Sequence, residues 1–430
     1  MMRYKPYSKY KLSGVEWLGK VPKGWAVKRL KHCVALQRKK KMPDSESNYL
    51  RLENIESWTG KLTSTEPHAN DGDAISFEPH DVLFGKLRPY LAKAWLSDRA
   101  GVCSSELLVL RPLELDPKFL ALWALNRDFV SEIDSSTFGT KMPRAEWNFI
   151  GNMPTLVPNI TDQRAIAAFL DRETGRIDAL VAKKERLIEL LKEKRQALIT
   201  RAVTKGLDPN AKMKDSGVEW LGQVPEGWEV TPFTKMVTEK SDYRGRTPEK
   251  IDDGVLLITA RNIRMGFIDY ECSQEYISDA SYVETMKRGF PKNGDILFTS
   301  EAPLGNVALV DREDVALAQR VIRFRMNPER IASTYALFAM MSAYFQYQLK
   351  RLATVSTAEG IKASKLFSLR LLVPSLAAQR AITTHLDHET TKLDALAEKT
   401  TQAIEKLKEY RAALISAAVT GKIDLREAAT

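Results

Sequence analysis

A long helical segment occurs twice in this chain, and it constrains the fold more than any other feature. The first copy runs from Gln163 to Thr204 and the second from Gln379 to Thr420, and the two align without a gap. Both open with Gln-Arg-Ala-Ile and close with Ala-Val-Thr. An internal repeat of this kind predicts a chain built from two related units.

Apolar residues recur in both copies at alternating steps of three and four, which predicts a long amphipathic helix with a narrow seam. The seam residues are Ile166, Leu170, Ile177, Leu180, Ile188, Leu191, Leu198 and Ala202 in the first copy, and Ile382, Leu386, Leu393, Leu396, Ile404, Leu407, Leu414 and Ala418 in the second. We expect Thr161 or Asp162 to cap the first helix. The two helices bury their seams most simply against each other; the alternative is that each packs on its own globular domain.

The length and charge of the chain bound what it can be. A chain of 430 residues exceeds a single core, so two or three domains are expected. Its formal net charge of +10 favours a polyanionic partner. The excess lies mostly in residues 1–160 and the first long helix, so we expect positive charge to be focused on particular loops.

Cysteine usage and hydropathy indicate the compartment. The three cysteines, Cys33, Cys103 and Cys272, are scattered and odd in number, which fits reduced thiols in a cytoplasmic protein. No apolar run approaches the length of a membrane span, and the N-terminal residues lack the core of a signal peptide. The sequence therefore predicts a cytoplasmic protein without a membrane partner.

The repeat extends beyond the helices to an entry motif that precedes each variable region. Ser-Gly-Val-Glu-Trp-Leu-Gly at 13–19 returns at 216–222, and each copy is followed by Val-Pro and Gly-Trp. Tryptophans beside Gly and Pro predict a tight docking element. Each variable region holds short strand-like runs and one expected helix, at Pro117–Val130 and Ile331–Leu352. The domains expected are residues 1–160 with entry motif 13–25, the helix 161–208, residues 209–376 with entry motif 216–228, and the helix 377–430.

Motifs for catalysis are missing from the sequence. It contains no phosphate-binding P-loop, no G-x-G-x-x-G after a strand and no Asn-Pro-Pro-aromatic methyltransferase signature. His385 and His388 are three apart on the second helix, but Phe169 and Arg172 replace them in the first copy. We therefore interpret the two histidines as solvated or seam-edge residues and expect no metal site.

The remaining chemistry is that of binding to nucleic acid. Lys86, Arg88 and Tyr90 follow a predicted strand on a turn that begins at Gly85, and Gly-Thr-Lys at 139–141 resembles Gly-Ile-Lys at 360–362. Glycine lets backbone amides approach a phosphate, and lysine supplies the charge. Arginine and asparagine can bond bidentately to guanine and adenine edges. The predicted DNA-binding residues are Lys86, Arg88, Tyr90, Thr140, Lys141, Arg144, Tyr243, Arg244, Arg246, Arg261, Asn262, Arg264, Lys362 and Lys365.

With these motifs the chain resembles the specificity subunits of type I restriction–modification systems, the HsdS family, over essentially its whole length. The resemblance rests on the duplicated entry motif, the Gln-Arg-Ala-Ile start and Ala-Val-Thr end of each helix, and the duplicated order. It implies an α+β fold: two α/β target recognition domains separated by a long antiparallel two-helix coiled coil, related by a pseudo-twofold internal repeat. It also implies that the chain has no catalytic residues.

The function implied is sequence-specific recognition of double-stranded DNA in a bipartite target, one domain per half-site. Two methyltransferase subunits would dock on the helices and methylate adenine N6, and restriction and translocase subunits would complete the complex. No cofactor is expected on this chain; S-adenosylmethionine and ATP with magnesium belong to the partners. A coiled-coil scaffold whose two domains bind protein is the alternative, and a stand-alone nuclease or methyltransferase comes third. Strongly salt-dependent, sequence-selective DNA binding would distinguish the first from the second.

Overall fold

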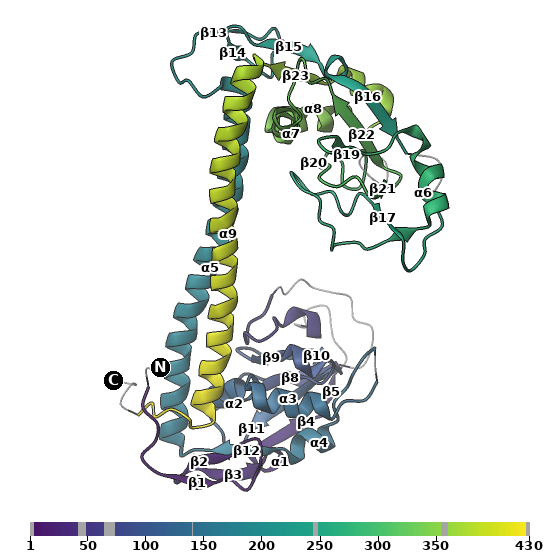
Figure 1. Ribbon diagram of the computed structural model, residues 1–430. Coiled ribbons are helices and arrows are strands. Elements are labelled where there is room, and N and C mark those ends of the chain that lie inside the picture. Colours follow the sequence, from purple (N-terminus) through teal and green to yellow (C-terminus); the bar gives the residue numbers. More distant parts are fainter. Residues whose placement is uncertain are drawn as a thin grey trace. The chain divides into compact units, whose positions relative to one another are not determined.

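The structure is a computed structural model that describes residues 4–41, 49–63, 74–139, 141–243, 248–353 and 360–426, apart from the side chains of Ala363 and Phe367 (Figure 1). The chain divides into two compact units, Met1–Glu185 with Thr401–Thr430, and Arg186–Thr400. Each unit contains a globular domain and parts of two long helices, α5 (Ile160–Lys205) and α9 (Leu376–Val419). The predicted α+β class is confirmed.

The globular domain of the first unit is built on a four-stranded antiparallel sheet in the order β4-β11-β8-β9. Alternate side chains of β8 and β11 point to opposite faces, as the two-residue period of a strand requires. Phe84 packs against Phe119 and Trp123 of the covering helices, whereas Leu83 packs against a second sheet, β5-β7-β10-β6. The bounds are β4 Val34–Gln37, β5 Lys40–Lys41, β6 Tyr49–Leu50, β7 Ala74–Phe77, β8 Val82–Gly85, β9 Ala94–Leu96, β10 Gly101–Ser104, β11 Leu107–Pro112, α2 Pro117–Ala124 and α3 Arg127–Ser135.

The second unit repeats this plan. Its four-stranded sheet has the order β16-β22-β19-β20, and a three-stranded sheet, β18-β17-β21, packs on one face. The β17–β21 pair is parallel, as is β6–β10 in the first unit. The bounds are β16 Val237–Asp242, β17 Val255–Ile258, β18 Tyr276–Ile277, α6 Asp279–Thr285, β19 Ile296–Thr299, β20 Val307–Leu309, β21 Val315–Leu317, β22 Val321–Met326, α7 Ser333–Met341 and α8 Ala343–Leu352.

Each expected single helix of the variable regions is a pair of shorter helices, so that part of the prediction was wrong. Asn126 leaves the helical backbone conformation (φ −68°, ψ 125°), and its side-chain oxygen accepts a hydrogen bond from the Asp128 amide to start α3. Ser342 (φ −66°, ψ 153°) separates α7 from α8 in the same way. Both residues are completely buried. Polar side chains that bond to nearby backbone compete with helix continuation, which explains the breaks.

The entry motifs form hairpins that pack at the ends of the long helices; the sequence predicted a docking element but not its location. Trp25 is 2% exposed beside Gly421, just after α9, where an added Cβ would lie 2.5 Å from Pro22. In the second unit, Trp228 packs in the same way beside Gly206. The hairpins and adjoining strand pairs are β1 Tyr10–Leu12 with β2 Lys20–Pro22, β3 Ala26–Arg29 with β12 Pro154–Val157, β13 Met213–Asp215 with β14 Gln223–Pro225, and β15 Glu229–Pro232 with β23 Arg370–Val373. The remaining short elements are α1 Leu30–Cys33, α4 Trp147–Asn152, η1 Leu52–Asn54, η2 Pro89–Leu91, η3 Phe233–Met236, η4 Met286–Arg288 and η5 Ala363–Ser368.

The repeated glutamine at the start of each long helix ties that helix to its domain. Gln163 is 1% exposed; its Nε2 donates to the Pro158 carbonyl (2.9 Å), and its Oε1 accepts from the Asp116 amide (2.6 Å). Gln379 makes the same pair of bonds, to Pro374 and from Ala332. The helix itself begins earlier than predicted, because Asn159 rather than Thr161 or Asp162 caps α5, through the Asp162 amide. Ser375 caps α9 in the same manner.

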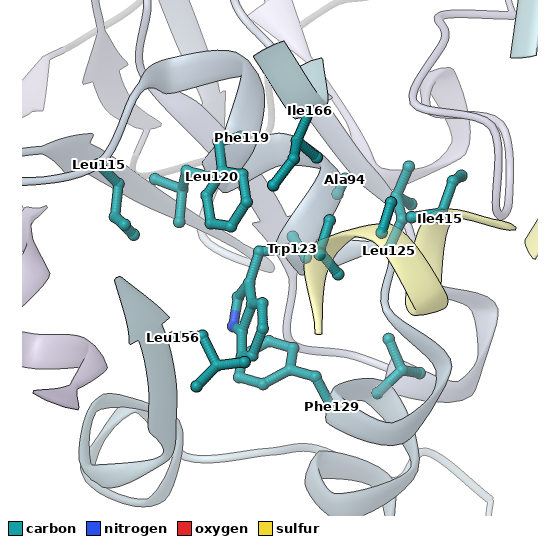
Figure 2. Close-up of a cluster of buried hydrophobic side chains, with 14 of the residues drawn as sticks. Ala94, Leu115, Phe119, Leu120, Trp123, Leu125, Phe129, Leu156, Ile166 and Ile415 are labelled. Atoms are coloured by element: carbon teal, nitrogen blue, oxygen red, sulfur yellow. The ribbon is translucent and has the colours of Figure 1, made fainter. Parts of the chain in front are cut away.

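The long helices pack both on each other and on the globular domains. Figure 2 shows Trp123 beside Phe129 and Leu156, in the cluster that Ile166 of α5 and Ile415 of α9 complete. In the second unit, one cluster contains Ile199 and Val203 of α5 with Ile382 and Leu386 of α9. The two expected modes of packing therefore occur together, because each cluster contains residues of both long helices and of one globular domain.

The seam prediction was wrong at one position of the repeat. Leu180 and its counterpart Leu396 are 43% and 46% exposed, whereas most other predicted seam residues are buried or half-buried. Ile199 is completely buried beside the half-buried Leu198. The narrow seam drifts round the helix because 3.6 residues per turn does not match a strict seven-residue period.

Candidate nucleic-acid interface

Two segments far apart in the sequence meet in the first unit and bring most of the predicted cations together. The segment after β8 carries Lys86 and Arg88, and it lies against residues 143–145. The Lys86 carbonyl accepts from the Ala145 amide (2.9 Å), and the Arg88 amide donates to the Pro143 carbonyl (2.8 Å). The resulting group of cations, which we call the first basic cluster, comprises Lys86, Arg88, Lys141 and Arg144.

Side-chain bonds hold two members of the first basic cluster in place. Arg144 Nη2 donates to Glu106 Oε1 at 2.5 Å, and Arg88 Nη2 donates to the Lys141 carbonyl at 3.4 Å. Arg88 has a left-handed backbone (φ 50°), which is uncommon for a residue other than glycine. Arg88, Lys141 and Arg144 are exposed and Lys86 is half-buried. The cluster thus presents cations to solvent from a defined backbone.

Exposed apolar side chains flank these cations. Tyr90 is 46% exposed, Phe138 is 80% exposed and Met142 is 54% exposed. Tyr90 is one of the residues predicted from the sequence, whereas Phe138 and Met142 are not; the position of Phe138 directly before Gly139 was the signal available. Cations interleaved with an aromatic surface suit a nucleic acid, since phosphates pair with the cations and bases or sugars contact the rings. Thr140 lies outside the described residues.

The equivalent place in the second unit has the same backbone connections and different side chains. The Ser300 carbonyl accepts from the Ile361 amide (3.0 Å), as Lys86 accepts from Ala145. Lys362 follows at once and is exposed. Lys365 is half-buried, and its Nζ donates to the Leu352 carbonyl (2.9 Å) at the end of α8. A cation at a helix C-terminus is stabilised by the helix dipole, so Lys365 has a structural role in this arrangement.

Burial argues against two predicted DNA contacts in the second unit. Asn262 is completely buried; its Oδ1 accepts from the Thr259 amide (2.9 Å), and its Nδ2 donates to the Asp269 and Ser273 carbonyls (3.0 and 2.9 Å). An amide occupied in this way cannot read a base edge. Tyr243 is 4% exposed, its hydroxyl donates to the Gly289 carbonyl, and burial raises its pKa.

The other predicted residues of the second unit differ in availability. Arg261 is exposed. Arg264 is exposed as well, but its Nη2 donates to Cys272 Sγ (2.8 Å), and its Nε lies 3.6 Å from Asp269 Oδ2. Arg244 and Arg246 lie outside the described residues. Of the two described arginines, Arg261 is thus the one whose side chain makes no hydrogen bond or ion pair among the described residues.

Metal and thiol chemistry find little support in the described part of the chain. Within it, no group of three or more His, Cys, Asp or Glu residues is placed to hold a metal ion. Burial raises the pKa of Cys33 to about 11 and that of Cys103 to about 12, which keeps both thiols protonated and poorly nucleophilic at neutral pH. Among the same residues, no helix is long and apolar enough to cross a membrane.

Comparison with known proteins identifies the family. Residues 225–406 match the family model described as "Type I restriction modification DNA specificity domain". The chain is 24% identical to the specificity subunit of the type I restriction enzyme MjaVIII from Methanocaldococcus jannaschii, over 95% of both chains. It is 21% identical to the EcoKI specificity subunit of Escherichia coli K12, over 94% of this chain and 90% of that one.

The chain belongs to the family of type I restriction–modification specificity subunits. The resemblance seen in the sequence is thereby confirmed. The chain is the specificity subunit of a type I system, the non-catalytic subunit of the enzyme.

Solved structures share the fold. A chain from a study of complex assembly and conformational transition of the type I R-M system matches with a TM-score of 0.70 and 19% identity, over 93% of this chain and 98% of that one. The HsdS subunit from Thermoanaerobacter tengcongensis matches with a TM-score of 0.51 and 18% identity, over 94% and 98%. Both likenesses extend over nearly the whole chain, so the HsdS fold covers both units.

Proposed function

We propose that this specificity subunit recognises a bipartite double-stranded DNA target, with one globular domain per half-site. The observation that carries the proposal is the repeated meeting of two distant segments at one place in each domain, after β8 and after β19. In the first unit this place gathers Lys86, Arg88, Lys141 and Arg144 on exposed loops. Phosphate contacts by such cations supply affinity, and base contacts from neighbouring side chains supply specificity.

The functional division of the chain follows the repeat. We assign target recognition to residues 1–160 and 209–376, and spacing and docking to the helical segments 161–208 and 377–430. Support comes from the buried Gln163 and Gln379, which fix each helix start to the domain before it. A recognition domain fixed in this way to a long helix has a defined orientation on that helix.

We further assign the exposed leucines of the long helices to the docking of two methyltransferase subunits. Leu180 and Leu396 occupy equivalent positions of the repeat, and both are more than two-fifths exposed. On α5, Leu187 and Leu190 follow Leu180 at helical spacing and are 38% and 45% exposed. Equivalent apolar positions on two helices suit two copies of one partner. Those partners would carry S-adenosylmethionine and methylate adenine N6, and restriction and translocase subunits would use ATP with magnesium.

The experiment combines binding with sequencing. The chain is co-expressed with its methyltransferase subunits in cells that lack other adenine methylation, and the modified motif is determined by sequencing. We expect one split motif with an unread spacer, and binding to a duplex of that sequence that weakens steeply with salt. Methylation without a split motif, or DNA binding that is insensitive to salt, would refute the proposal and favour a scaffold that binds protein.

A further inference from the structure

The residue just before β11 in the first unit and the residue just before β22 in the second occupy equivalent places in the two four-stranded sheets. The Lys86 amide donates to the Glu106 carbonyl (3.0 Å), immediately before β11, and the Ser300 amide donates to the Arg320 carbonyl (2.9 Å), immediately before β22. These matching bonds make Glu106 and Arg320 structural equivalents. The first unit therefore has a carboxylate where the second has a guanidinium, at the edge where the two distant segments meet.

In the second unit this place opens into a pocket of about 260 Å³. Its polar lining residues include Lys250, Arg261, Glu275, Gln319 and Arg320. Lys250 is neutralised by Glu275 (2.7 Å), which leaves Arg261 and Arg320 as the cations of the lining without a carboxylate partner from within it. The volume lies below that of a typical small-molecule site, and the lining combines apolar surface with a few polar side chains, which suits a planar group that has a polar edge.

Arg320 lines the pocket with most of its donors unused. Its Nε lies 2.9 Å from Glu301 Oε1, its side chain is 50% exposed, and its backbone is left-handed (φ 73°). Such a conformation is unfavourable in a residue with a side chain and is concentrated at functional sites. Within the described residues, no other hydrogen bond of the Arg320 guanidinium is present, so its two Nη groups remain available.

Two further donors face the same opening. Arg261, on the turn after β17, and Gln319, next to Arg320, are both exposed. Neither side chain makes a hydrogen bond or ion pair within the part of the chain that the structure describes. Several free donors thus line one small pocket, on turns that adjoin strands. This arrangement distinguishes the pocket from a single solvated charge on a loop.

We propose that this pocket reads a guanine in the second half-site, with Arg320 as the base-contacting residue and Glu301 as the residue that positions it. The inference rests on the proposed function. The guanidinium fork matches the O6 and N7 acceptors of guanine, and this pairing is the commonest specific contact in the major groove. Glu301 fixes the Nε side of the fork and leaves the Nη side for the base.

The equivalent residue of the first unit has the opposite chemistry. Glu106 Oε1 accepts from Arg144, and Glu106 Oε2 is buried without a hydrogen-bond partner among the described residues. Neither carboxylate oxygen of Glu106 is therefore free to contact a base, and the first unit has no guanidinium at this position. The contact with guanine is expected in the second half-site, where Arg320 stands at the equivalent place.

The test compares variants of the complex with its methyltransferase subunits by the motif that each methylates in cells. Arg320→Ala should lose the requirement for guanine at one position of the second half-site and leave the first half-site unchanged. Methylation of the original target should fall about 10-fold to 100-fold, the effect of losing one bidentate base contact. Arg320→Lys retains the charge without the fork, so it should relax the same position with a smaller loss of overall binding.

Arg330→Ala is the matched control. Arg330 is also a half-exposed arginine with a carboxylate neighbour, Glu229 at 3.4 Å, and it lies beyond the other end of β22. Its motif should be that of the wild type. If the complex with Arg320→Ala fails to assemble, the test uses Arg320→Lys and Glu301→Gln instead. A weaker requirement for guanine at one position of the second half-site in these variants supports the proposal.

An unchanged motif and rate in the Arg320 variants would overturn the assignment. That outcome is separate from failure of the proposed function, in which the wild-type complex itself would methylate no split motif. A loss of both half-sites together in Arg320→Lys would also overturn it, because a residue that reads one base cannot abolish the distant half.

Discussion

Arg411 of α9 donates from Nε to Asp178 Oδ1 of α5 at 2.9 Å, and the repeat places the same ion pair at Arg195 and Asp394, where the closest nitrogen and oxygen are 3.0 Å apart. The surroundings differ. Arg411 is 8% exposed and also donates to the Trp58 and Thr59 carbonyls (2.8 and 2.9 Å). The pair in the first unit is therefore a buried junction between both helices and the recognition domain.

We predict that Arg411→Ala lowers the free energy of unfolding of the first unit by about 2–4 kcal/mol, because it removes a buried guanidinium that holds two carbonyls and leaves Asp178 with Lys61 (2.7 Å) as its remaining partner. Arg195→Ala is the matched control: Asp394 is 57% exposed, so the cost should be about 1 kcal/mol or less. Urea denaturation followed by tryptophan fluorescence measures both. Equal shifts in the two variants would show that burial of Arg411 contributes nothing.

A second prediction concerns Asp295, which holds two arginines of the second sheet. Its carboxylate accepts from Arg323 (2.7 Å), which is 1% exposed, and bidentately from Arg325 (2.9 Å for each bond). Asp295→Asn removes this charge and leaves the buried Arg323 guanidinium with Glu239 as its remaining carboxylate partner. We expect a loss of about 3–5 kcal/mol, as for other broken buried ion pairs.

The effect of Asp295 should depend on pH in a defined direction. Burial opposes its ionisation, but the hydrogen bonds from Arg325 and Arg323 outweigh burial and hold the pKa of Asp295 below its ordinary value. A carboxyl with a depressed pKa in the folded state stabilises fully above its unfolded pKa of about 3.9, and the stabilisation is lost as the pH falls through the folded pKa. The difference in the free energy of unfolding between wild type and Asp295→Asn should be constant from about pH 5 to about pH 8 and should shrink below about pH 4. A difference that grows on acidification would contradict this account.

The lysines that bind phosphate should be distinguishable from those with a structural role. Lys141→Ala and Lys362→Ala should weaken binding to all DNA sequences alike and reduce the salt slope by about one unit for each lost contact. Lys365→Ala is the control from the same loop, since its ammonium is bonded to the Leu352 carbonyl. It should lower thermal stability and leave the slope intact. Slopes come from DNA titrations at several salt concentrations, and a change of slope in Lys365→Ala alone would reverse the assignment.

The hypothesis that each recognition domain reads one half-site independently can be tested by exchange of one domain. Residues 30–153 lie between β3 and β12, which pair with each other, so both junctions fall at the same small sheet. Replacing this segment with that of another specificity subunit should change one half of the methylated motif and leave the other half and the spacer unaltered. Exchange of the equivalent segment between β15 and β23 is the reciprocal control. Changes in both halves from a single exchange would show that the domains do not act separately.

The helices and strands could be predicted from the sequence because local periodicity determines them. The span of α5, the core strands β8, β11, β19 and β22 and the docking of Trp25 all follow from patterns within a few residues. The repeat adds a further signal, since the ion pair of the buried Asp81 with the partly exposed Arg111 recurs as Asp295 and Arg325, each bidentate at 2.8 or 2.9 Å.

The site was harder to predict because its members are defined by non-local pairing. Asn262 was chosen as a base reader from its neighbours, yet it closes a turn just as Asn54 does, whose Oδ1 accepts from the Arg51 amide (2.8 Å). The dipeptide Asn-Ile occurs at 54–55 and again at 262–263, and this recurrence in the two units was the sequence signal for the structural role. Arg320 gave no local signal, because its place opposite Ser300 depends on the pairing of β19 with β22.

The last prediction tests whether the helices determine the spacing of the half-sites. Insertions are placed after Glu185 in α5 and after Thr400 in α9, where the chain divides into its two units. Four residues add about 6 Å to each helix and turn the seam by only about 40° beyond a full turn, so the packed faces still meet. DNA rises about 3.4 Å per base pair, so the unread spacer should grow by about two base pairs while both half-sites stay the same. Two-residue insertions are the control: they rotate the seam by about 200° and should abolish methylation. The motif of each variant is determined by sequencing of methylated DNA. An active four-residue variant with an unchanged spacer would show that these helices do not measure the distance between the half-sites.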